Sequence, residues 1–184
     1  MVANKIMKKK TKRIFSRKQH KGREDLAGEY KWGDAGQIIL FFVFFSLLLA
    51  DDLIFHWQGF LGISVSFWIR VIISAPVFFI AGYLARQGLR IVFKEERGQM
   101  KVINKGVFGI VRHPIYLGSI LFYFGSVVIS FSFVCFLIWI IIVLFYCYIA
   151  KYEEKILIEK IGPEYLNYMK KTGFLIPKIK KQGT

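Results

Sequence analysis

The sequence predicts an all-α integral membrane protein with about four transmembrane helices, the last two a tight hairpin, and a short C-terminal cytosolic helix. Of the 184 residues, 55% are hydrophobic, although the formal net charge is +15. Basic residues are also segregated from the apolar stretches, because they crowd residues 1–31, 86–112 and 151–180. A soluble domain rarely combines these properties, whereas membrane proteins commonly do.

The positive charge is also typical of nucleic-acid-binding proteins. Here the basic tracts flank apolar stretches and form no recognisable folded module, so we expect no nucleic-acid partner. We interpret the charge as membrane topology plus attraction to anionic lipids, through a basic cytosolic N-terminal arm at residues 1–33. Cys135 and Cys147 share one apolar run and the three histidines are scattered, so we expect neither a disulfide framework nor a metal site.

The first transmembrane helix is predicted near the start of residues 34–94, the region that holds helices 1 and 2. Gln37–Ala50 is almost purely apolar, but it is shorter than the roughly 20 residues that a helix needs to cross a bilayer. The first span must therefore continue through Asp51 and Asp52 to about Phe55.

The second span is predicted from about Ile63 to Leu84, with a kink at Pro76. Arg70 lies inside it, at a depth similar to that of Asp51 and Asp52 in the first span. Charges within a membrane usually pair or mark a function. We expect an Asp–Arg pair that fixes this helix hairpin, and the alternative is that Arg70 snorkels to the outer surface.

Residues 95–184 are predicted to hold a connector, transmembrane helices 3 and 4 and the C-terminal helix. Ile115–Ala150 is too long for one span and is therefore two helices, with the turn at Ser130–Ser132. Gly162 suits a helix stop and Pro163–Lys171 a short amphipathic helix. The last residues, 172–184, are basic and are expected to be loose.

Four spans place both chain ends on the side of the Lys/Arg-rich segments, which the positive-inside tendency makes the cytosolic side of the cytoplasmic membrane. Arg112-His113 and Glu153-Glu154 should then meet at this face. Pro114 fits the first turn of the third helix and pushes His113 toward an extended backbone. The free N–H groups of such a helix start suit an anionic part of a small molecule. The alternative is an ordinary helix start with interfacial side chains.

Several of these residues together resemble a known family. They are Gly106-Val107-Phe108, then Arg112-His113-Pro114-Ile115-Tyr116-Leu117-Gly118, then Glu153-Glu154 with Leu157, Gly162, Tyr165 and Tyr168. The ordered set resembles the isoprenylcysteine carboxyl methyltransferase family and the related phospholipid methyltransferases. The likeness covers roughly Arg90–Pro177, about half of the chain, whereas the first two spans match only in character.

The resemblance implies an integral membrane enzyme that transfers a methyl group from S-adenosylmethionine to a lipid-like or prenylated acceptor. The reaction would be carboxylate O-methylation or amine N-methylation at the cytosolic membrane face. The residues that would bind the cofactor are Met100, Lys101, Val102, Ile103, Phe108, His113, Pro114, Ile115, Tyr116, Glu153 and Glu154. Arg112 and Glu153 are the candidate catalytic residues. Lys151 is the candidate substrate contact, because Ile149 stands where the prenylcysteine enzymes have an Arg.

The chemistry of methyl transfer is compatible with these residue types. A methyl sulfonium is already an activated electrophile, so the protein supplies alignment and dehydration more than acid–base groups. One alternative is an NADPH-dependent membrane sterol-type reductase, which shares a similar stretch but usually differs at the positions of Ile115 and Ser119. Another alternative is a non-enzymatic membrane transporter or assembly protein. The feature that favours it is the set of charges within the spans, Asp51, Asp52 and Arg70.

Overall fold

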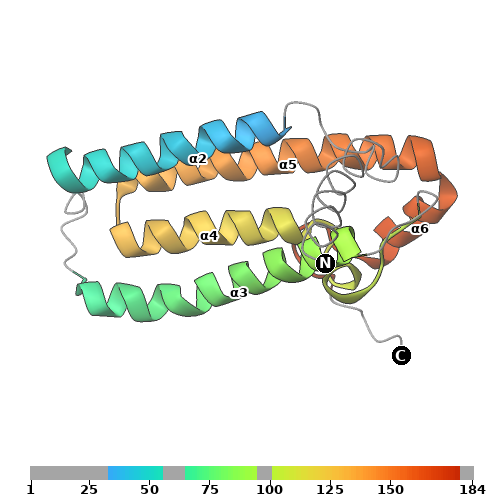
Figure 1. The fold of residues 1–184 in the computed structure, drawn as a ribbon, viewed down its shortest axis with the longest axis horizontal. Coiled ribbons are helices and arrows are strands. Elements are labelled where there is room, and N and C mark those ends of the chain that lie inside the picture. Colours follow the sequence, from blue (N-terminus) through green and yellow to red (C-terminus); the bar gives the residue numbers. More distant parts are fainter. Residues whose placement is uncertain (1–32, 56–64, 95–100, 179–184) are drawn as a thin grey trace, which may run out of the picture.

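The computed structural model describes residues 33–55, 65–94 and 101–178, and these residues are all-helical apart from turns and loops. Within these ranges the chain forms five α-helices, which are arranged side by side or end to end in Figure 1. They are α2 (Gly33–Ala50), continued by the π-helical turn η2 (Asp51–Phe55), α3 (Phe67–Lys94), α4 (Pro114–Ser130), α5 (Phe133–Ile161) and α6 (Pro163–Lys171). A short 3-10 helix, η4 (Gly106–Gly109), precedes α4.

Three of these elements are long and apolar enough to cross a membrane: α2 with η2, α3 and α5. α4 is a shorter apolar helix. Large hydrophobic side chains on the outer surfaces of α2 and α3 are exposed, among them Phe42, Trp68 and Phe79. Such surfaces fit a lipid environment, so the chain is an integral membrane protein. The count of about four spans remains a prediction.

Helix boundaries agree well with the sequence. The first apolar helix continues through Asp51 and Asp52, as its length required. α3 remains one helix through Pro76 and extends to Lys94. The predicted basic arm, apart from Gly33, and the turn between the first two spans lie outside the described residues.

α4 lies between α3 and α5, and α2 runs along α5 (Figure 1). The closest neighbour of α4 is α3, because glycines bring the backbones of these two helices together. A Cβ placed on Gly118 would lie 2.9 Å from the carbonyl oxygen of Ala81 and 3.2 Å from the amide nitrogen of Ala85. α4 therefore packs more extensively against α3 than against α5, its partner in the predicted tight hairpin.

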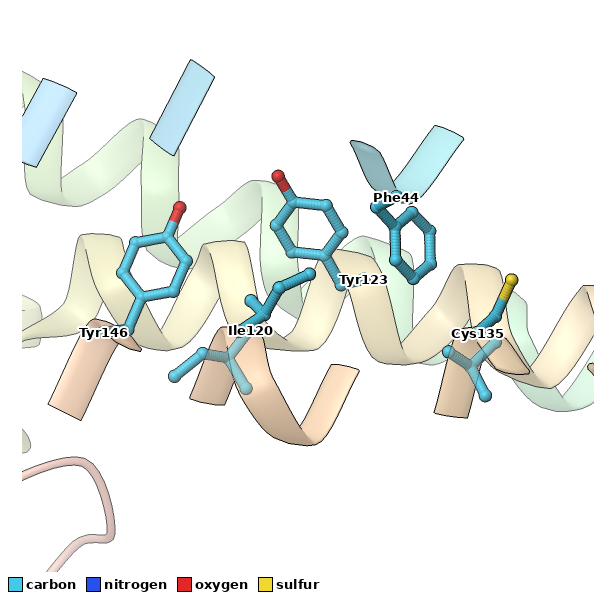
Figure 2. Packing of buried hydrophobic residues seen from close by; sticks show 7 residues of the cluster. Phe44, Ile120, Tyr123, Cys135 and Tyr146 are labelled. Carbon is cyan, nitrogen blue, oxygen red and sulfur yellow. The ribbon is translucent and has the colours of Figure 1, made fainter. Parts of the chain in front are cut away.

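The apolar core fills the space among α2, α4 and α5. Figure 2 shows part of this core, in which Phe44, Ile120, Tyr123, Cys135 and Tyr146 are all buried. The rings of Phe44 and Tyr123 meet edge to face, with centroids 5.0 Å apart. Cys135 is fully buried and serves as core filler, as its place in an apolar run indicated.

The turn between α4 and α5 falls where the sequence predicts it. Phe131 adopts a left-handed conformation with φ 56°, and the hydroxyl of Ser132 caps α5 by accepting a hydrogen bond from the Cys135 N–H. Arg70 Nη1 donates to the carbonyl oxygens of Ile129 (2.9 Å) and Ser130 (3.2 Å).

The expected pairing of Arg70 with Asp51 or Asp52 is therefore wrong for the part of the chain that the structure describes. α3, which carries Arg70, packs beside α4. The carbonyl groups at the end of α4, which have no partner within that helix, take the Arg70 guanidinium instead.

Candidate functional site

The site is built at the start of α4. Pro114 occupies the first turn, where its missing N–H costs no hydrogen bond. His113, directly before it, has φ −123° and ψ 63°, outside the helical region that a following proline disfavours. As the N-cap residue, His113 makes no side-chain capping bond, and its ring reaches α5 instead.

The charged end of α5 supplies two neighbouring carboxylates. His113 Nε2 lies 3.1 Å from Glu154 Oε1, and His113 Nδ1 lies 3.9 Å from Glu153 Oε2. The Tyr116 hydroxyl donates a hydrogen bond of 2.5 Å to Glu153 Oε1. The imidazole, which is buried, is thus held between both carboxylates, so that α4 and α5 meet here as the sequence predicts.

Arg112 binds Glu154 and two carbonyl groups. Its Nε lies 2.5 Å from Glu154 Oε1, and its Nη1 donates to the carbonyl oxygens of Met169 (3.1 Å) and Thr172 (2.7 Å). The Arg112 and Glu154 side chains are both only 9% exposed. The rigid fork of guanidinium donors therefore joins the connector before α4 to α5, to the end of α6 and to the segment after it.

That segment, Thr172–Lys178, is here called the C-terminal strap. The sequence led us to expect a loose tail, but Thr172 and Gly173 are buried. The Arg112 backbone N–H donates to the Gly173 carbonyl oxygen over 2.8 Å, and Val111 and Gly173 form a parallel bridge. Because Val111 and Arg112 pair with the backbone of Gly173, the first part of the strap is fixed against the site despite its basic composition.

Phe174 is the site neighbour that the sequence did not single out. Its ring meets the His113 imidazole edge to face with centroids 5.3 Å apart, and the Arg112 guanidinium carbon lies 5.5 Å from its centroid. The imidazole also stacks on the Tyr116 ring, with centroids 5.7 Å apart and an interplanar angle of 4°. The one feature of the sequence that could have indicated this contact is that Phe174 is an aromatic residue within a basic tail.

α6 turns back from the end of α5 toward the connector that precedes α4 (Figure 1). It begins after Gly162, which has φ 72°, and its bounds are those predicted. The Tyr168 hydroxyl donates to the Phe108 carbonyl oxygen over 2.6 Å, which ties α6 to η4. Burial raises the pKa of Tyr165 and of Tyr168, and the negative charge of Glu154 adds to both effects. Both phenols therefore stay neutral, and both rings are buried.

Other predicted residues lie around this cluster rather than in it. Phe108 is half-buried in η4, and Ile115 packs toward α3, where a Cβ on Gly88 would lie 2.6 Å from Ile115 Cγ1. Lys151 is exposed, and Ile149 is fully buried in the bundle. Lys101, Val102 and Ile103 precede η4 and add no side-chain hydrogen bond to the cluster within the described ranges, and Met100 lies outside them.

Comparison with family models matches residues 54–163 to phospholipid methyltransferase. The match covers more than half of the chain and includes both the start of α4 and the carboxylate pair of α5. A comparison with individually curated proteins gave no match. The chain therefore belongs to the phospholipid methyltransferase family, whose members are membrane methyltransferases that act on lipid-like substrates.

Proposed function

We propose that the chain transfers a methyl group from S-adenosylmethionine to the polar head of a lipid-like acceptor, at the end of the bundle where α4 begins. The observation that carries the proposal is the cluster of His113, Tyr116, Glu153 and Glu154, built from two helices at the point where their apolar stretches end. A lipid head group and a water-soluble cofactor can both reach this level.

The residues of the cluster fit the cofactor. Glu153 offers a carboxylate to the amino or ribose groups, and its orientation is set by the Tyr116 hydroxyl. The positive end of α4, at Pro114 and Ile115, suits the cofactor's carboxylate. Aromatic faces such as that of Tyr116 attract a cationic sulfonium. Phe108, Lys101, Val102 and Ile103 would contribute the connector side of the site.

The cofactor supplies the activated methyl group, so the protein has to align the acceptor and keep water out. The Tyr116–Glu153 hydrogen bond and the contact of His113 with Glu154 preorganise the cluster for this role. A carboxylate acceptor needs no base, and an amine acceptor has only to be neutral when it attacks. Arg112 gives its donors to Glu154, Met169 and Thr172, so we assign it a positioning role beside the site.

The acceptor that we favour carries an amine head group. A carboxylate acceptor would be bound best by a cation at the position of Ile149, which is an apolar residue fully buried in the bundle. Lys151, two residues further on, is exposed, and we retain it as a contact for the acceptor's phosphate. The positive-inside tendency puts the site and both chain ends on the cytosolic side.

The first test is calorimetric titration of S-adenosylhomocysteine into the purified protein in detergent. We expect binding to the wild-type protein and at least tenfold weaker binding to His113→Ala and Glu153→Ala. Glu159→Ala is the matched control, because it removes an exposed carboxylate from the same helix. Wild-type affinity in both site variants, or binding of NADPH instead, contradicts the proposal.

The second test identifies the acceptor. The protein is incubated with methyl-labelled S-adenosylmethionine and a total lipid extract, and the labelled product is identified by mass spectrometry. We expect label on the amine head group of a phospholipid. Label on a prenylated carboxylate would overturn the preference for an amine, and the absence of any labelled lipid from a protein that binds the cofactor would overturn the lipid-like acceptor.

A further inference from the structure

The C-terminal strap has an inner face that touches both the site and the core. Phe174 lies against His113 and Arg112. Leu175, the next residue, packs against the buried cluster among α2, α4 and α5. The strap therefore lies at the boundary between the apolar bundle and its charged end.

The outer face of the strap is both apolar and basic. Ile176 is 81% exposed, directly after two residues that pack inward. Lys178 Nζ donates to the carbonyl oxygens of Met169 (2.8 Å) and Lys170 (3.0 Å), which brings it to the end of α6. Lys170 and Lys171 are both exposed and belong to the last turn of the same helix, so three lysines and one exposed isoleucine fall within residues 170–178.

The charge of this surface is not balanced locally. Between Pro163 and Lys178 the one acidic residue is Glu164, in the first turn of α6 and thus at the opposite end of that helix. The position of the strap along the membrane normal follows from its contacts. Its Phe174 touches His113, which directly precedes α4, and its Leu175 packs against the core. At this end of the apolar bundle an integral membrane protein meets lipid head groups. An exposed isoleucine near three lysines in the chain therefore complements an anionic bilayer surface.

We propose that the outer face of the strap, formed by Ile176, Lys170, Lys171 and Lys178, docks on anionic phospholipid head groups. Docking holds Phe174 against His113, and anionic lipid thereby strengthens binding at the site. The second statement rests on the proposed cofactor site, whereas the first does not. The basic arm at residues 1–33 is a separate attraction to the same kind of lipid, and the experiment has to distinguish the two.

The docking itself is tested by hydrogen exchange of a peptide spanning residues 172–178. The full chain is placed in nanodiscs of phosphatidylcholine, with or without phosphatidylglycerol. We expect exchange of the strap to slow by roughly fivefold when the anionic lipid is present. The Lys170→Gln/Lys171→Gln and Ile176→Ser variants should lose most of this protection.

Two controls identify the source of the effect. The variant Lys8→Gln/Lys9→Gln removes the same charge from the N-terminal arm and should keep the protection. Soluble glycerol phosphate added to phosphatidylcholine discs should give none. Protection that is equal in both lipids, that survives the strap substitutions, or that soluble phosphate reproduces would overturn the docking.

The coupling to the site is tested by the affinity for S-adenosylhomocysteine in the same discs. We expect roughly five- to tenfold tighter binding with phosphatidylglycerol, and no such gain in the Lys170→Gln/Lys171→Gln variant. Lipid-dependent protection without any cofactor binding supports the docking and contradicts the proposed function. Cofactor binding without a response of the strap to lipid contradicts the docking alone.

Discussion

Arg112 Nε lies 2.5 Å from Glu154 Oε1, and this ion pair joins the residue before His113 to the charged end of α5. The same guanidinium also binds the carbonyl groups of Met169 and Thr172. Three parts of the chain that are distant in sequence, around Arg112, Glu154 and Met169–Thr172, therefore meet at one side chain.

Arg112→Ala should destabilise the protein strongly. The substitution removes the cation that pairs with the buried Glu154 carboxylate and that binds the Thr172 carbonyl group, and breaking such a buried pair costs about 3–5 kcal/mol. The apparent Tm in detergent measures the effect. Because Arg112→Ala/Glu154→Ala removes both charges, the double variant should lose less than the sum of the single variants, and full additivity would show that the pair is not coupled.

Tyr116→Phe should weaken cofactor binding without unfolding the protein. The variant loses the hydroxyl that orients Glu153, but its ring can still stack on His113. A hydrogen bond to a charged group contributes about 1.5–3 kcal/mol, so we expect about tenfold weaker binding of S-adenosylhomocysteine or more. The exposed Tyr148→Phe on α5 is the control. Unchanged affinity in Tyr116→Phe would exclude this hydroxyl from the site.

Gly118→Ala should disrupt the packing of α4 on α3. The added Cβ would lie 2.9 Å from the backbone oxygen of Ala81, which cannot move without the helix, so we expect a loss of about 1–3 kcal/mol. Gly82→Ala on α3 is the matched control, because nothing lies within 4 Å of its Cβ position. That variant should be neutral or more stable, since alanine favours helix. Equal apparent Tm values for both would contradict the close contact.

Arg70→Ala should lower stability and leave the cofactor affinity unchanged. Arg70 covers the carbonyl groups of Ile129 and Ser130 at one end of α4, whereas His113 lies at the other end. Thermal unfolding in detergent and titration of S-adenosylhomocysteine separate the two effects. Arg70→Lys keeps the charge but has fewer donors, so it should fall between the wild type and Arg70→Ala. An Arg70→Ala variant as stable as the wild type would show that the contact of Arg70 with these carbonyl groups does not stabilise the protein.

Helix ends were largely predictable because their signals are local. Pro114 marks the start of α4, and Gly162 the end of α5. The meeting of His113 with the α5 carboxylates followed from the same boundaries, since two helices joined by a short turn bring their outer ends together. The roles of these residues in cofactor binding stay predictions.

Lateral arrangement was harder to predict. Apolar composition gives the depth of a residue but not which helix lies beside it, which is why the partner of Arg70 was missed. Two glycines on α4, Gly118 and Gly125, could have indicated the close packing. A Cβ atom added to either would lie 2.9 Å from an atom of α3. The strap was missed because its basic composition concealed Phe174 and Leu175, two residues that pack inward.

The shortness of α4 has a consequence for the membrane in which the protein resides. Its 17 residues rise about 26 Å, whereas the 28 residues of α3 rise about 42 Å. A typical hydrocarbon layer is about 30 Å thick, and the Arg70 guanidinium binds the Ile129 carbonyl group at the end of α4. If α4 crosses the bilayer as the sequence predicts, the surrounding lipid should thin there, and bilayers with shorter acyl chains should accommodate the protein with the least mismatch.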